Sequence, residues 1–204
     1  MRRILMAAVA LAAVSACAQM NTSARPTAAA EASLQGNERL TAEAQELNHL
    51  TRVAIDANRL YDEAAEEADD AGLKAALISI STQRKAFARG LQQRVAAIGG
   101  EPAQTGEATA AVYRSFAALR GLIGNDSIAA AGEVYRGESY MIDELDEALT
   151  TGLTPASSQI VEAELARVKS GRDRVEQVKT QIETRLMAEA AREGAASQSS
   201  PDPG

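Results

Sequence analysis

Three charged residues interrupt apolar stripes that otherwise have the spacing of an inward-facing helix surface. Glu138 lies in a stripe with steps of three and four, which places its members along one helix face. The members are Ile128, Ala131, Tyr135, Glu138, Ile142, Leu145 and Leu149. Arg84 and Arg172 interrupt two further stripes. Because a buried unpaired charge is costly, we expect a buried Glu138–Arg172 ion pair with Arg84 nearby. The alternative is that one or both arginines reach solvent between the helices and leave Glu138 near water. Either role is structural, and no catalytic residue is predicted.

A second motif, Glu46-Leu47-Asn48-His49, has the Glu-x-x-His spacing of a metal-ligating pair. A di-iron bundle uses two such motifs and two further Glu ligands, whereas this chain has one histidine. His49 stands two residues past Leu47, roughly 200° round the helix, so it faces solvent when Leu47 faces inward. We therefore expect a surface histidine beside a surface carboxylate, no metal site and no cofactor. The competing interpretation is a reduced carboxylate site around Glu63 and Glu138 in a metal-binding, storage or oxidoreductase protein. A third is a small-ligand binder, which would need a cavity beside the helical glycines Gly90, Gly137 and Gly171.

The stripes belong to helices that the sequence pattern predicts over 37–69, 71–98, 107–123, 126–151 and 155–192. Asp70 is suited to cap the second helix, and Gly99-Gly100-Glu101-Pro102 ends it. Gly152-Leu153-Thr154-Pro155 turns the chain into the last helix. Two short turns make two antiparallel hairpins, and the segment 99–125 is long enough to return along the bundle. The predicted fold is all-α, a four-helix bundle whose hairpins are joined by a crossover containing a short extra helix.

The first sixteen residues have the pattern of an export signal. Arg2 and Arg3 precede an apolar run that is too short to span a bilayer, which takes ~20 residues. Val14-Ser15-Ala16-Cys17 resembles the lipobox of bacterial lipoproteins, and Cys17 is the only cysteine. The resemblance implies cleavage before Cys17 and acylation of its sulfur and amine. Cleavage after Ala18 would instead leave a soluble periplasmic protein.

The rest of the chain divides by composition. Residues 17–36 have no apolar period and are dominated by small and polar side chains, so we expect a flexible tether. Residues 194–204 are rich in Ser, Pro and Gly, so we expect a disordered tail. The helical pattern between them predicts one domain over 37–193.

Several stretches of this domain together resemble a bacterial family of unknown function, over residues 45–180. They are Leu47-Asn48, Tyr61-Asp62-Glu63-Ala64-Ala65, Leu73-Lys74-Ala75, Leu91, Gly99-Gly100-Glu101-Pro102, Arg136-Gly137-Glu138 and Asp173-Arg174-Val175. The resemblance implies a ferritin-like four-helix bundle with a short extra helix in the crossover. Members of that family commonly have a His where this chain has Arg172. The family has no assigned activity, so the resemblance bears on the fold more than on the function.

Charge and composition exclude several functions. The formal net charge is −7, and removal of Arg2 and Arg3 makes it more negative, which argues against binding nucleic acid or anionic lipid through a basic face. The sequence has no Gly-rich phosphate loop and no nucleophile paired with a base.

Ala18 follows Cys17, as in lipoproteins sorted to the outer membrane. We therefore expect a non-enzymatic module, lipid-anchored at the periplasmic face of the outer membrane, that has a structural role or binds an unidentified envelope protein.

Overall fold

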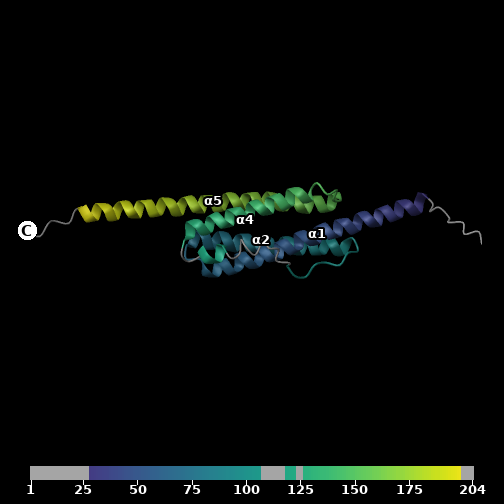
Figure 1. Ribbon diagram of the computed structural model, residues 1–204, viewed down its shortest axis with the longest axis horizontal. Coiled ribbons are helices and arrows are strands. Elements are labelled where there is room, and N and C mark those ends of the chain that lie inside the picture. The colour runs from purple at the N-terminus through teal and green to yellow at the C-terminus, as the bar shows by residue number, and fades with distance from the viewer. Residues whose placement is uncertain (1–27, 107–117, 123–125, 199–204) are drawn as a thin grey trace, which may run out of the picture.

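A computed structural model describes residues 28–106, 118–122 and 126–198 of the chain (Figure 1). Every regular element within these ranges is a helix. The long helices are α1 (Ala28–Glu67), α2 (Ala71–Ala97), α4 (Ser127–Ala148) and α5 (Pro155–Gln198). Residues 118–122 are also helical. The all-α helical bundle that the sequence predicts is confirmed. Most of the short helix expected over 107–123 lies outside the described residues.

The helix boundaries follow from local capping chemistry. Asp70 caps α2, because its side chain accepts a hydrogen bond from the Leu73 amide at 2.8 Å. Asp126 caps α4 in the same way through the Ala129 amide. Gly99 follows α2 at a φ of +82° and Gly152 follows α4 at +83°, a backbone region that L side chains rarely adopt. Both sharp turns therefore lie where the glycines of the sequence predict them.

Both long outer helices extend beyond the bundle, at opposite ends of the molecule (Figure 1). Helix α1 begins at Ala28 and covers part of the expected tether 17–36, and α5 continues to Gln198 into the expected tail 194–204. Alanine runs such as Ala28-Ala29-Ala30 form helix by intrinsic propensity. The prediction of a tether relied on the absence of an apolar period and did not take this propensity into account. Residues 32–42 and 184–195 are exposed, although Arg185 at the start of the second range still pairs with Asp70 at 2.7 Å.

The helices pack as two antiparallel hairpins, α1 with α2 and α4 with α5, joined mainly through α2 and α5. Helices α1 and α4 have little direct contact. The crossover follows α1, because the Asn48 side chain donates to the Glu101 carbonyl at 2.9 Å and accepts from the Ala103 amide at 2.7 Å. Further along, Leu119 is buried with Leu60 and Val134 in one hydrophobic cluster. The crossover thus supplies part of the core on the side where α1 and α4 are apart.

The hydrophobic core consists of two clusters, one in each half of the bundle. The first includes Leu60, Tyr61, Leu73, Leu77, Ile80, Val134, Val175 and Ile182. The second includes Leu47, Leu50, Phe87, Leu91, Val95, Ile142, Leu145, Val161 and Val168. Arg84 of α2 and Glu138 of α4 are buried between the residues of the two clusters, whereas the buried Glu164 of α5 lies between Val161 and Val168 of the second cluster. These three charged residues form a polar layer at the boundary of the two apolar halves.

Candidate functional site

The polar layer is built around Arg84, whose guanidinium bridges two carboxylates. Its Nη2 donates to Glu138 Oε2 on α4 and its Nη1 donates to Glu164 Oε1 on α5, each at 2.5 Å. The side chains are at most 1% exposed. The two terminal nitrogens of the guanidinium bind carboxylates of two different helices. Arg84 of α2 therefore connects its own hairpin to both helices of the other hairpin at mid-bundle.

The predicted Glu138–Arg172 pair is wrong, although Arg84 and Glu138 are both buried as expected. The Arg172 side chain is 30% exposed, pairs with the adjacent Asp173 at 3.3 Å, and lies over the Tyr135 ring at 5.6 Å from its centroid. Glu164 takes the place in the cluster that was assigned to Arg172. Arg172 thus behaves as in the alternative interpretation and extends toward solvent, whereas Glu138 stays dry.

The error has a simple cause in the register of α5. The buried positions of this helix alternate by four and three, and they are Ser157, Val161, Glu164, Val168, Gly171, Val175, Val178 and Ile182. The stripe predicted for this helix consisted of Val161, Leu165, Val168, Arg172, Val175, Lys179, Ile182 and Leu186. It therefore took Leu165, Arg172 and Lys179 in place of Glu164, Gly171 and Val178, because the apolar Leu165 is the stronger signal. The steps of four and three through Ser157, Glu164 and Gly171 were present in the sequence, but they require polar residues and a glycine on the inward face.

Burial and nearby charges act in opposition on the pKa values of Glu138 and Arg84, but burial and the charge of Glu138 act in the same direction on that of Tyr61. Burial raises the pKa of Glu138, although Arg84 and a hydrogen bond from Tyr61 favour the ionised carboxylate. Burial also disfavours the charge of Arg84, but the two carboxylates outweigh it and raise the pKa of Arg84. Burial and the nearby charge of Glu138 together raise the pKa of Tyr61 well above its ordinary value. The arginine therefore stays charged and pairs with both carboxylates, and Glu164 also accepts a hydrogen bond from the exposed Arg167 at 3.2 Å.

Two helical glycines make room for the cluster. A Cβ atom at Gly137 would lie 2.6 Å from the Tyr61 hydroxyl, and one at Gly171 would lie 3.1 Å from Glu138 Oε2. These glycines therefore accommodate Tyr61 and Glu138. Gly90 has no neighbouring atom within 4 Å of a Cβ position, so it has a different role.

A second polar cluster, which the sequence analysis missed, joins three helices at the end of the bundle where α5 begins. Glu43 of α1 accepts hydrogen bonds from the hydroxyls of Thr154 and Ser157, and from the Thr154 amide at 3.3 Å. Arg94 of α2 donates to both hydroxyls at 2.8 Å. Burial alone would raise the pKa of Glu43, but the hydrogen bonds from Ser157 and Thr154 outweigh it and lower this pKa. Glu43 therefore caps the start of α5 from another helix.

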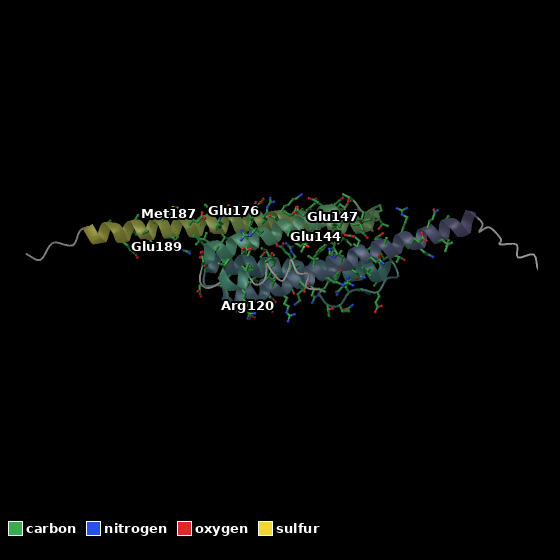
Figure 2. The ribbon with its side chains drawn as sticks, viewed as in Figure 1. Arg120, Glu144, Glu147, Glu176, Met187 and Glu189 are labelled. Atoms are coloured by element: carbon green, nitrogen blue, oxygen red, sulfur yellow. The ribbon has the colours of Figure 1, made fainter. Side chains whose placement is uncertain are left out.

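The remaining candidate ligands lie nearer the surface and apart from the central cluster. His49 is partly exposed, and its Nε2 lies 2.6 Å from Oε2 of Glu144, which projects from α4 (Figure 2). It thus pairs with Glu144 of another helix rather than with the adjacent Glu46. Burial and a hydrogen bond to Glu144 raise the pKa of Tyr140 to about 12. Glu63 pairs with Arg59 at 3.3 Å, partly exposed, whereas Glu138 is in the core. The structure therefore does not bring Glu63 and Glu138 together.

The described part of the chain shows neither a cluster of metal ligands nor a membrane-spanning helix. There, no three His, Cys, Asp or Glu residues are arranged to hold a metal ion. No helix in the same ranges combines the length and the apolarity needed to cross a bilayer. In the central cluster, the position between the Glu138 and Glu164 carboxylates is filled by a guanidinium group.

Comparison with known proteins gives two matches. The profile of a family described as a domain of unknown function (DUF2383) matches residues 42–151. The pattern of the prokaryotic membrane lipoprotein lipid attachment site matches residues 1–18, which include Cys17. No match was found among curated proteins. Both the predicted family and the predicted attachment site are thereby supported, although Cys17 itself lies outside the described residues.

Proposed function

Because the chain belongs to the DUF2383 family and has a lipoprotein attachment site, we propose that it is a lipid-anchored structural or protein-interaction module of the cell envelope. In this proposal the bundle binds an envelope protein and catalyses no reaction. Its anchor is the acylated Cys17, and more than one acyl chain makes such anchoring stable. Ala18 after Cys17 favours the periplasmic face of the outer membrane.

The observation that carries the non-catalytic proposal is the position of Arg84. A metal site in a helical bundle places carboxylates from facing helices around a cation. Here two such carboxylates, Glu138 and Glu164, are held by one fully buried guanidinium. A metal ion at this place would have to displace Arg84 into an apolar interior, which is strongly unfavourable. The cluster therefore favours a role in holding helices together.

The first experiment measures metal content. The mature chain from position 17, with Cys17→Ala to prevent acylation, is purified without chelators, exposed to ferrous iron, desalted and analysed by elemental mass spectrometry. We expect iron, manganese and zinc far below one ion per chain. Near-stoichiometric metal that is lost in Glu138→Ala, but kept in the exposed control Glu66→Ala, would overturn the proposal and support the metal-binding alternative.

The anchoring part of the proposal has its own test. The complete precursor is expressed in a Gram-negative host, and inner and outer membranes are separated by density. We expect the wild-type protein in the outer-membrane fraction and Cys17→Ala outside it. Recovery of the wild type in the soluble periplasmic fraction would instead support cleavage after Ala18.

A further inference from the structure

A groove of about 530 Å³ lies between α2 and α5, on the half of the bundle where α5 begins. Its apolar lining consists of Ala86, Phe87, Gly90, Ala156, Ile160 and Ala163. Its polar lining consists of Thr82, Gln83, Gln159 and Arg167. Phe87 is buried at its base, whereas Ala86, Ala156 and Ala163 are exposed along its edges. The volume lies within the range of about 300–1,000 Å³ that small-molecule sites occupy.

The polar groups gather mainly at one end of this groove. Arg94 contacts Ser157 and Arg84 contacts Glu164, so α2 and α5 run antiparallel along it. This register places Arg167 level with Gln83. The stretch from there toward Gly90 is lined mainly by apolar side chains and by glycine, with Gln159 at its far end. The groove thus has a cationic end and a total length of about 16 Å, the rise of α5 from position 156 to 167.

Arg167 is suited to bind an anion at the polar end. Its side chain is 58% exposed, and its Nη1 donates to Glu164 Oε2 at 3.2 Å. A guanidinium has five N–H donors, so it can keep this bond and still receive a carboxylate. Glu164 is also held by Arg84, so it does not depend on Arg167 alone for a counter-charge.

Gly90 keeps the apolar part of the groove open. A glycine inside a helix costs ~1 kcal/mol relative to alanine. Gly137 and Gly171 are explained by the atoms that a Cβ would meet, but a Cβ at Gly90 would meet none within 4 Å. Its empty side-chain position belongs to the groove lining instead.

We propose that this groove binds a single-chain amphiphile with a carboxylate head, such as a fatty acid. The carboxylate pairs with Arg167, and the acyl chain lies along Ala86, Ala163 and Gly90 toward Ile160. A carboxylate is favoured over a cationic head because the charged residue of the lining is an arginine. A helix from a second copy of the chain would fit the groove less well. The polar side chains that flank its apolar face would need partners along both edges of the groove, whereas the charged residue of the lining, Arg167, lies at one end.

Dodecanoate is the test ligand, titrated below its micelle concentration into the mature chain carrying Cys17→Ala and followed by isothermal titration calorimetry. We expect one site per chain. Gly90→Leu fills the groove and should abolish binding, whereas Gly132→Leu is a matched control at another helical glycine with open space around it. Arg167→Gln should weaken binding about tenfold or more, the usual effect of losing a charge-assisted hydrogen bond. Arg174→Gln, at an exposed position of α5, should leave binding unchanged.

Two results would overturn the proposal. The first is no binding of dodecanoate, or equal binding by wild type and Gly90→Leu when both melt normally. The second is concentration-dependent dimerisation in analytical ultracentrifugation that Gly90→Leu abolishes, because a second copy would then cover the groove. Dodecyltrimethylammonium, which has the same chain and a cationic head, should not bind. Its binding as tightly as dodecanoate would refute the role of Arg167.

Discussion

The two buried polar clusters of this bundle use a glutamate and an arginine in opposite ways. In the central cluster, Glu138 lies in a dry interior and shares one guanidinium with Glu164, and its pKa is raised. In the end cluster, Glu43 accepts hydrogen bonds from two hydroxyls and an amide as well as Arg94, and its pKa is lowered. At Glu138 the salt bridge at 2.5 Å therefore does not offset the desolvation of the carboxylate, whereas at Glu43 several hydrogen bonds do.

The difference shows what each cluster contributes to the fold. The central one connects α2, α4 and α5; burial outweighs pairing at Glu138, whereas pairing outweighs burial at Arg84. A buried ion pair of this kind contributes mainly by fixing which helices meet and in which register. The end cluster caps the N-terminus of α5 from α1 and contributes directly to stability. Four predictions test this comparison, beginning with the largest expected effect.

Arg84→Met should destabilise the protein most, by about 3–5 kcal/mol, because it leaves the buried Glu138 carboxylate without a counter-charge and Glu164 with the exposed Arg167 alone. Urea unfolding followed by circular dichroism at pH 7 measures the effect, with Arg174→Met as an exposed control. Combining Arg84→Met with Glu138→Leu and Glu164→Leu should return stability close to that of the wild type or above it. A single Arg84→Met variant as stable as the wild type would show that the central cluster is not buried in solution.

Glu43→Ala should cost about 1–3 kcal/mol, the usual penalty when buried partners lose a charged hydrogen-bond acceptor. Arg94 and the hydroxyls of Thr154 and Ser157 remain but lose their common partner. The same urea titration measures this loss, with the exposed Glu66→Ala as control. Hydrogen exchange should also show faster opening of the first turn of α5. A loss of unfolding free energy as large as that of Arg84→Met would contradict the expectation that the central cluster is the more sensitive of the two.

The two glutamates should give opposite pH dependence. A lowered native pKa means that Glu43 adds stability above its ordinary value of 4.5, and this contribution is lost as pH falls through the native pKa. A raised native pKa means that Glu138 loses stability as pH rises from 4.5 through the native pKa. Between pH 4 and pH 7, Glu138→Gln should therefore gain stability relative to the wild type. Below pH 4.5, the free energy of unfolding of Glu43→Gln should depend less steeply on pH than that of the wild type. Parallel curves for both variants would contradict the comparison.

The smallest effects concern the glycines. Gly171→Ala places a methyl group 3.1 Å from Glu138 Oε2 and should destabilise by about 1 kcal/mol, because the gain in helix propensity is outweighed by crowding at the charged group. Gly90→Ala meets no atom within 4 Å and should stabilise by about 0.5–1 kcal/mol. Thermal melting of both variants at pH 7 measures the difference. Equal shifts in one direction would show that Gly171 is not fitted to Glu138.

Periodicity and turn chemistry were enough to predict the four long helices apart from their outer ends, the two hairpins, and the burial of Arg84 and Glu138. They failed for Glu164, because an apolar Leu165 beside it gave a stronger inward signal than a carboxylate. They also failed for Glu43, since Glu43, Arg94, Thr154 and Ser157 each have the character of an ordinary surface residue. Such residues form a cluster only when three helices converge, and that convergence is a tertiary property which a single helix pattern does not contain.

The opposite ends at which α1 and α5 leave the bundle have a mechanical consequence. The membrane anchor lies before α1, and the exposed part of α5, with Met187 and Glu189, points the other way (Figure 2). A pull between the membrane and a partner held there would load both helices along their axes. Such a load shears the whole interface between the hairpins at once, instead of peeling it turn by turn, and Arg84 crosses that interface at mid-length.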